Sequence, residues 1–223
     1  LIIRRLRGMK RVALCPTLPS FGGKDRLLLD VGANTDVRAE HILQHAIFAS
    51  VYLKATTHID KPLVGLINIG TEPGKGRDLE KETFDLLSSD DSVHFYGNLE
   101  PKELLSTPCD ILITDGFSGN LVMKTMEGTA KALGAALKEE IMKTTKGKLG
   151  ALLMKKNLKA FKNRLNPDYI GGAVIFGVNG VVVKAHGSSS GFAFSRAIHQ
   201  ARLAVKGELI PLMKEHLEHH DQT

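Results

Sequence analysis

One stretch of this 223-residue chain constrains its fold more than any other, the segment from Cys109 to Lys143. It opens with the apolar residues 111–114, ILIT, which are typical of a buried strand, and then turns sharply through 115–120, DGFSGN. After the turn, apolar residues recur at helical spacing: Leu121, Met123, Met126, Ala130, Leu133 and Leu137. The pattern predicts a strand, a polar glycine turn and a helix, the arrangement that places a ligand site in an open α/β sheet.

The turn at 115–120 favours an anionic ligand. Gly116 and Gly119 allow the backbone to approach a ligand closely. The unpaired N–H groups at the start of the following helix face the same turn. An ordinary strand-to-helix connection with a capping serine is the alternative interpretation of this turn taken alone.

Two earlier strands end in similar polar turns. Residues 27–31 are an apolar strand that ends in the turn 32–34, and Asn34 in that turn is a candidate substrate-binding residue. Residues 63–69 are a second strand, followed by the glycine-rich loop 70–76. Helices are predicted after both turns, over 39–53 and from near Leu79. Strands alternating with helices favour a parallel sheet covered on both faces, and its carboxyl ends share one edge, where ligands bind.

The loop 70–76, GTEPGKG, resembles a phosphate-binding P-loop but is one residue short, and no Ser or Thr follows Lys75 to hold magnesium. It is therefore interpreted as a flexible loop that presents one ammonium group. A solvated loop lysine is the alternative.

The remaining elements follow from the same patterns. We predict a helix end at 1–7 closed by Gly8, an extended segment at 11–20, a strand at 93–96 and a short helix from Pro101. Near the end of the chain we predict a strand at 174–176, a tight reversal at 178–180, a strand at 181–184 and one long helix at 192–217. Because the first helix has no visible beginning, we expect the chain to be the later part of a longer one.

Composition limits the class of protein. Apolar residues make up 43% and charged residues 24%, which is ordinary for a globular chain, and we predict a single α/β domain over 1–223. No apolar run reaches the roughly 18 residues of a membrane span, and no signal peptide is apparent. Cys15 and Cys109 form no pairing pattern, which predicts reduced thiols in a cytoplasmic protein. The net charge of +6 indicates an anionic partner, but the absence of Trp argues against nucleic acid.

A basic segment over about 143–165 contains no acidic residue. Apolar residues are interleaved in it at roughly helical spacing: Leu149, Leu152, Leu153, Leu158, Phe161 and Leu165. A basic amphipathic helical hairpin of this kind suits an anionic membrane surface, an acidic protein or a dimer partner. A solvated basic face over a core helix is the alternative.

The polar turns are rich in hydrogen-bond donors and poor in acids. A Ser-His-Asp hydrolase is not predicted, because no G-x-S-x-G elbow is present and Asp115 most simply caps the amides after it. Spacings typical of metal ligands are missing, so we predict no metal site and no cofactor. The expected donors are the side chains of Lys75, Ser118, Asn120, His186, Ser188 and Ser189 and the amides of Gly116 and Gly119. Such a pocket binds phosphate and stabilises an oxyanion, which favours acyl or phosphoryl transfer over hydride transfer.

The chain resembles the phosphate acyltransferase family of bacterial phospholipid synthesis along essentially its whole length. The matching segments are LLLDVGAN at 27–34, VGLINIGTEPGKG at 64–76, FYGNLE at 95–100, TDGFSGNLVMKTMEG at 114–128, and YIGGA with VVVKAHGSS within 169–189. The resemblance implies transfer of an acyl group from acyl carrier protein to inorganic phosphate. It also implies a Rossmann-like α/β/α sandwich with a mostly parallel sheet, akin to isocitrate and isopropylmalate dehydrogenases, and a homodimer peripheral to the inner face of the membrane.

By position, the resemblance makes Lys75 and Asn120 the catalytic residues. Arg77 stands where members of that family often have Asn, and Ser190 where Asp often follows the paired serines. A strand with D-A-M-G-G-D-H and a turn with S-A-G-N-T-G, typical of the family's front part, do not occur here.

Three alternatives stay open. A phosphotransacetylase-like enzyme would share the fold. A dehydrogenase would share it too, but would need carboxylates that these loops lack. A third possibility is a non-catalytic fragment that only binds acyl carrier protein or membrane.

Overall fold

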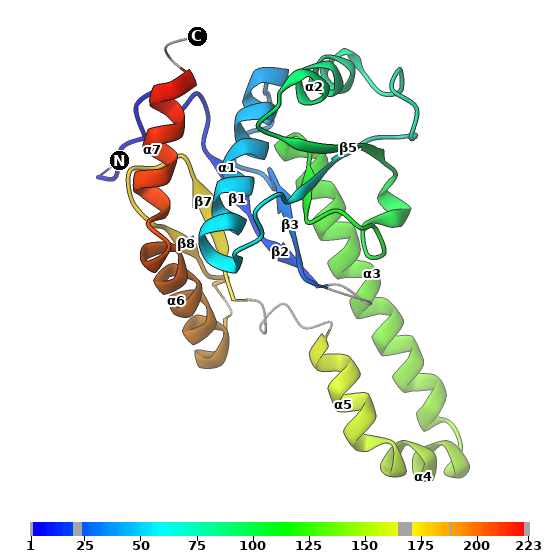
Figure 1. Ribbon diagram of the computed structural model, residues 1–223. Coiled ribbons are helices and arrows are strands. Elements are labelled where there is room, and N and C mark those ends of the chain that lie inside the picture. The colour runs from blue at the N-terminus through cyan, green and yellow to red at the C-terminus, as the bar shows by residue number, and fades with distance from the viewer. Residues whose placement is uncertain (1, 20–23, 165–170, 188, 221–223) are drawn as a thin grey trace.

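A computed structural model describes residues 2–19, 24–164, 171–187 and 189–220 (Figure 1). Its main sheet has the strand order β2-β3-β6-β4-β5. The strands are β2 (Thr17–Leu18), β3 (Arg26–Leu29), β6 (Ile111–Ile113), β4 (Leu63–Ile67) and β5 (His94–Leu99). All neighbours pair in parallel except β2, which is antiparallel to β3. The predicted parallel sheet is confirmed, and the stretch that begins at Cys109 supplies its central strand.

Helices follow the strands as the apolar periodicity predicts. They are α1 (Ala39–Thr57), α2 (Asp78–Ser89), the short 3-10 helix η1 (Pro101–Glu103), α3 (Gly116–Met142), α4 (Thr145–Leu153), α5 (Lys155–Arg164), α6 (Gly191–Lys206) and α7 (Leu209–His220). The helix expected to begin at Pro101 is therefore present, with Pro in its first turn.

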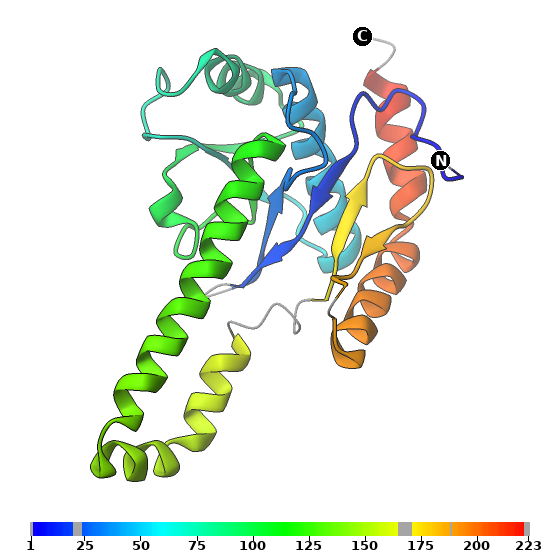
Figure 2. The same ribbon diagram turned by 180° about the vertical axis from the view of Figure 1, so that it is seen from behind.

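Alternate strand residues face two different cores, because successive side chains point to opposite faces of a sheet. Ile111 and Ile113 pack in the larger core, which includes residues of α1 and α7. Leu112 packs in the smaller core, where Met123 and Met126 of α3 cover it. Helices therefore lie on both faces of a mostly parallel sheet, and the predicted α/β class is confirmed (Figures 1 and 2).

A second sheet has the order β1-β7-β8, with β1 (Ala13–Cys15), β7 (Ala173–Phe176) and β8 (Val183–Lys184). β1 leads through Pro16 into β2 and so runs against the direction of β3. β7 is antiparallel to β1 and β8 is antiparallel to β7. β8 therefore points away from the edge at which β3, β6 and β4 end.

Two predicted helices need correction. Residues 2–7 are not helical: Arg5 forms a β-bridge with Val178, and the Leu6 amide donates to Gly177 O. So short a segment has little helix stability of its own, and pairing with the 177–179 turn prevails. The single helix predicted over 192–217 is interrupted between α6 and α7, where Glu208 adopts a left-handed backbone with φ of 53°.

The helical hairpin is longer than the sequence predicted. α3 has 27 residues, of which only Gly116 and Gly119 are buried, and its second half leaves the body of the protein. α4 lies at the far end and α5 returns, so the outgoing arm is α3 itself (Figures 1 and 2). No helix within the described part of the chain is both long and apolar enough to cross a membrane.

Candidate functional site

The turns after β3, β6 and β4 meet at one edge of the sheet, because these three strands are parallel neighbours. The first two turns touch through their backbones. A Cβ atom on Gly116 would lie 2.1 Å from Asn34 O, and one on Gly119 would lie 2.0 Å from Asp30 O. Both glycines, predicted as substrate-binding positions, are thus required for the contact between the two turns.

Asp30 organises the first turn from its centre. Its side chain is fully buried and accepts hydrogen bonds from the amides of Leu14, Ala33 and Asn34 at 2.9–3.0 Å. Asp30 was not among the residues predicted to form the site. The available signal is a carboxylate at the end of an apolar strand, which must find donors if it is buried.

Asn34 serves the same turn. Its side-chain nitrogen donates to Val12 O at 2.5 Å and to Asp30 Oδ2 at 3.0 Å. The donor that was predicted to reach substrate is therefore engaged within the fold, and Asn34 shapes the edge.

Asp115 caps α3. One carboxylate oxygen accepts from the amides of Phe117 at 3.0 Å and Ser118 at 2.9 Å, and the other accepts from Ser118 Oγ at 2.7 Å. Burial alone would raise the pKa of Asp115, but the hydrogen bonds from Ser118 and the nearby Arg77 guanidinium outweigh it. The pKa therefore lies below its ordinary value, and the carboxylate is charged.

The cap changes what this turn offers a ligand. The amides of Phe117 and Ser118 donate to Asp115, as does the Ser118 hydroxyl, and the amide of Gly119 donates to Asp115 O. The position at the helix N-terminus that suits an anion is thus taken by the chain's own carboxylate. Asn120 follows, half-buried, with its amide nitrogen beside Gly32.

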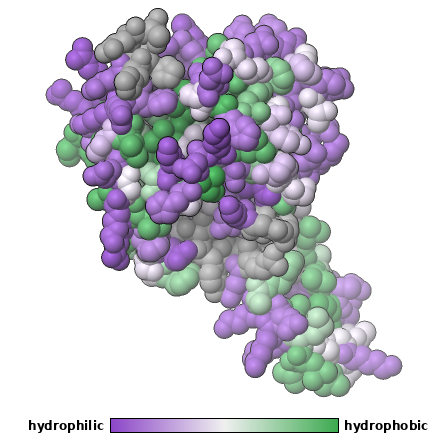
Figure 3. All heavy atoms as spheres, in the orientation of Figure 1, coloured by the Kyte–Doolittle hydropathy of each residue, from purple (hydrophilic) through white to green (hydrophobic). Residues whose placement is uncertain are grey.

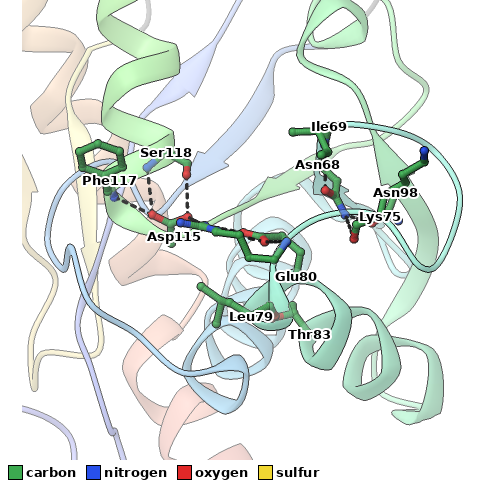
Figure 4. Close-up of polar contacts among 11 residues, drawn as sticks. Asn68, Ile69, Lys75, Leu79, Glu80, Thr83, Asn98, Asp115, Phe117 and Ser118 are labelled. Atoms are coloured by element: carbon green, nitrogen blue, oxygen red, sulfur yellow. Dashed lines mark hydrogen bonds and ion pairs between the residues drawn. The ribbon is translucent and has the colours of Figure 1, made fainter.

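Two buried asparagines shape the loop that carries Lys75. Asn68 Nδ2 donates to Lys75 O at 3.0 Å and to Asn98 Oδ1 at 3.2 Å, while Asn98 Nδ2 donates to Glu72 O at 2.8 Å. Lys75 itself is exposed. In Figure 4, Asn68, Lys75 and Asn98 form one group and Asp115, Phe117 and Ser118 another, with Glu80 between them.

Arg77 connects these two groups. Its guanidinium donates to Asp115 Oδ2 at 2.7 Å and contacts both carboxylate oxygens of Glu80. The two carboxylates raise the pKa of Arg77, so its charge is permanent. Arg77 was not predicted as a site residue, and only its departure from the family pattern was apparent in the sequence. A signal was present in the Arg-x-x-Glu spacing, since Glu80 Oε2 accepts from the Arg77 amide in a capping box.

The structure does not bring His186 to this edge. His186 follows β8, whose direction is opposite to that of β3, so it lies toward the other edge of the sheets. There it belongs to the turn before α6, where the Ser189 amide donates to His186 O at 3.0 Å. Ser188, also predicted to bind substrate, lies outside the described residues.

The cysteines are not placed to act as nucleophiles. Both are free and buried, and burial raises the pKa of the Cys15 and Cys109 thiols. What the edge can present is an ammonium group from Lys75 and an amide from Asn120, beside Arg77 and its two carboxylate partners, Asp115 and Glu80. That combination suits binding of an anion without a covalent intermediate.

Comparison with known sequences gives consistent matches over the whole chain. A phosphate acyltransferase of Acholeplasma laidlawii (strain PG-8A) is 53% identical over 222 residues, 99% of this chain and 66% of that protein. A phosphate acyltransferase of Staphylococcus aureus (strain JH9) is 46% identical over 214 residues, 96% of this chain and 65% of that protein. The chain thus spans just under two thirds of the length of these relatives.

Solved structures show the same fold at low sequence identity. A phosphotransacetylase from Streptococcus pyogenes has a TM-score of 0.56 at 16% identity and covers 92% of this chain and 57% of its own. A branched-chain phosphotransacylase from Enterococcus faecalis V583 has a TM-score of 0.56 at 15% identity and covers 91% of this chain and 65% of its own. The sequence model of the family described as fatty acid synthesis protein matches residues 1–211, and the chain belongs to that family.

Proposed function

We propose that this protein transfers a fatty acyl group from acyl carrier protein to inorganic phosphate, forming acyl phosphate for phospholipid synthesis. Family membership and two relatives named phosphate acyltransferase support the reaction class. The observation that carries the proposal is the shared sheet edge, where the loop of Lys75 and the turn of Asn120 follow adjacent parallel strands.

In the proposed reaction a phosphate oxygen attacks the thioester carbonyl carbon. An O–C bond forms, the C–S bond breaks, and the thiolate of the carrier leaves and takes up a proton. Lys75 holds the phosphate or the developing oxyanion, and Asn120 donates a hydrogen bond to the same centre. No enzyme nucleophile takes part, which agrees with the buried, un-ionised thiols.

The other predicted substrate-binding residues divide into two groups. Gly116, Ser118, Gly119 and Asn34 support the proposal by shaping the edge, since their contacts hold the two turns together. The substrate-binding roles of His186 and Ser188 stay predictions. Single replacement of either by Ala, with the KM for phosphate and for the acyl carrier measured, tests them.

The test of the proposal is an assay for acyl phosphate from acyl carrier protein and phosphate. Lys75→Ala and Asn120→Ala should each lower kcat by about 10²–10³, the usual cost of losing one such donor. Lys81→Ala is the matched control, because Lys81 is an exposed lysine of α2 whose ion pair is with Asp78 of the same helix. Near-normal turnover by Lys75→Ala or Asn120→Ala would contradict the assigned roles.

A second candidate is acyl transfer of the phosphotransacetylase type, with a coenzyme A thioester in place of the carrier protein. The likeness to phosphotransacetylase folds favours it. Comparing acyl phosphate formation from acyl carrier protein and from acetyl-coenzyme A decides between the two. If neither thioester reacts but the carrier still binds, the chain is a non-catalytic binding unit.

We also propose that the protein is a cytoplasmic homodimer, peripheral at the inner face of the membrane. The support is the helical hairpin of α3, α4 and α5, where Leu149, Leu152 and Leu153 of α4 are 60–80% exposed. Figure 3 shows apolar side chains gathered at the hairpin end farthest from the body. Lysines surround them, which suits an anionic bilayer or the acidic carrier protein.

A further inference from the structure

The loop of Lys75 and the turn of Asn120 belong to different strands, and one ion pair joins them. Arg77 stands two residues after Lys75, and its guanidinium lies 2.7 Å from the Asp115 carboxylate, 38 residues along the chain. Among the ion pairs of the described residues, the Arg77–Asp115 pair is the one that connects two turns of this edge.

The pair has an electrostatic consequence for an anionic substrate. The Asp115 carboxylate is only 3% exposed and lies in the same turn as Asn120, the residue proposed to donate a hydrogen bond at the reacting centre. Unpaired, it would repel a phosphate of charge near −2, and low-dielectric surroundings would strengthen the repulsion. Arg77, which it shares with Glu80, offsets part of that charge, while Asp115 keeps its place as the cap of α3.

The pair also has a geometric consequence. Two residues of chain span at most about 7 Å, so fixing Arg77 limits how far the Lys75 backbone can move from the α3 turn. The guanidinium bonds to Glu80 at the same time, and this second contact holds it in one orientation.

We propose that Arg77 is a positioning residue for phosphate, which holds the Lys75 loop against the α3 turn and offsets the charge of Asp115. The inference rests on the proposed function, because it assigns the anion at this edge to the phosphate substrate. Arg77 acts through Lys75 and Asp115, without itself contacting the reacting atoms.

The experiment compares three variants in the full chain, with Kd for inorganic phosphate measured by calorimetry and KM for phosphate measured in the acyl phosphate assay. Arg77→Asn keeps a good N-cap for α2 but removes the cation, and it should raise Kd and KM about tenfold. Arg77→Lys keeps the charge but lacks the planar guanidinium group, which can bond two carboxylates at once. Its Kd and KM for phosphate should lie between those of the unaltered chain and Arg77→Asn. Arg77→Asn combined with Asp115→Asn removes the unpaired carboxylate and should bring Kd back to within a few-fold of the original.

Arg38→Asn is the matched control. Arg38 is the N-cap arginine of α1, is exposed, and forms its ion pair with Glu40 of that same helix. This variant should leave phosphate Kd unchanged. Equal phosphate Kd for Arg77→Asn and the unaltered chain, or no recovery in the double variant, would overturn the inference, even if thermal stability fell.

A pH readout tests the pair without turnover. Because the pKa of Asp115 is lowered, its charge contributes stability that is present above about pH 4 and lost as pH falls through the folded-state pKa. Without Arg77 that pKa should rise, so acid unfolding of Arg77→Asn should begin at higher pH than that of Arg38→Asn.

The two proposals fail in different ways. Phosphate binding that depends on Arg77, with no acyl phosphate formed, would contradict the proposed function and leave the positioning role standing. Acyl phosphate formation with no dependence on Arg77 would support the proposed function and contradict the positioning role. Absence of phosphate binding by the unaltered chain would overturn both.

Discussion

The carboxyl edge of the sheet and the helical hairpin differ in what they bury: the edge buries charged side chains, and the hairpin exposes apolar ones. At the edge, Asp30 and Asp115 are 0% and 3% exposed, and each carboxylate accepts several hydrogen bonds from its own chain. In the hairpin, Leu152 and Leu153 are 66% and 80% exposed. The described residues therefore determine the shape of the edge among themselves, whereas the hairpin presents apolar surface that they leave open.

Helix α3 belongs to both regions. Its first turn is capped by Asp115 and packs against the backbone of residues 30–34. Met123 and Met126 further along the helix pack on the smaller core. Beyond them, Leu133 and Leu137 are 65% and 50% exposed. One continuous helix thus links the proposed phosphate site to the proposed membrane contact.

The largest expected effect concerns the hairpin. Leu152→Glu combined with Leu153→Glu should lower binding of the protein to anionic liposomes at least a hundredfold, because burying two leucines contributes about 3–6 kcal/mol. Raising the salt concentration should loosen the unaltered protein only partly, since screening weakens the lysines and leaves the apolar contribution. Liposome flotation measures both.

Thr145→Glu combined with Asn157→Glu is the matched control, because it adds the same two charges at exposed polar positions of α4 and α5. It should weaken liposome binding far less than the leucine pair, and phosphate Kd should be unchanged in both. Unaltered liposome binding by the leucine variant would assign the hairpin to dimer packing or to carrier docking.

The second largest expected effect is a loss of stability when the contact between the two turns at the sheet edge is disturbed. Gly119→Ala places a methyl group 2.0 Å from Asp30 O, and backbone on both sides must shift to admit it. We expect a loss of about 2–3 kcal/mol, which lowers Tm by roughly 5–10 °C for a chain of this length. Calorimetric Tm is the measurement, and an unchanged Tm would mean that the two turns do not touch.

The sheet edge itself could be predicted from the sequence, because each strand and its turn carry a local signal. The apolar runs ending at 31, 69 and 114 are the strands β3, β4 and β6, and their turns are neighbours. Lys75 and Asn120 were selected as donors because a glycine loop and a strand–turn–helix pattern are visible locally, and the family resemblance then made them the catalytic residues.

Contacts made across the chain could not be predicted in this way. Arg77 meets Asp115 across 38 residues, and nothing local to either residue indicates the other. The position of His186 was partly indicated: the tight reversal predicted at 178–180 makes β8 antiparallel to β7. That turn says nothing of how β7 runs relative to β3, so the sequence did not indicate that β8 ends away from the edge at which β3 and β4 end.

The smallest expected effect is a gain of stability on glycine-to-alanine substitution in the exposed part of α3. Gly134 and Gly128 lie in the exposed arm of α3, and a methyl group on either would meet no atom within 4 Å. Gly134→Ala should therefore stabilise the protein by about 0.5–1 kcal/mol, because alanine loses less backbone freedom than glycine in a helix. The same substitution thus has opposite signs at Gly119 and Gly134, 15 residues apart in one helix. Calorimetry on both variants, with Gly128→Ala as a duplicate, checks the sign. A loss of stability at Gly134 would show that the arm packs closely against a second copy of the chain, and the contrast between a self-contained edge and an open hairpin would then not hold.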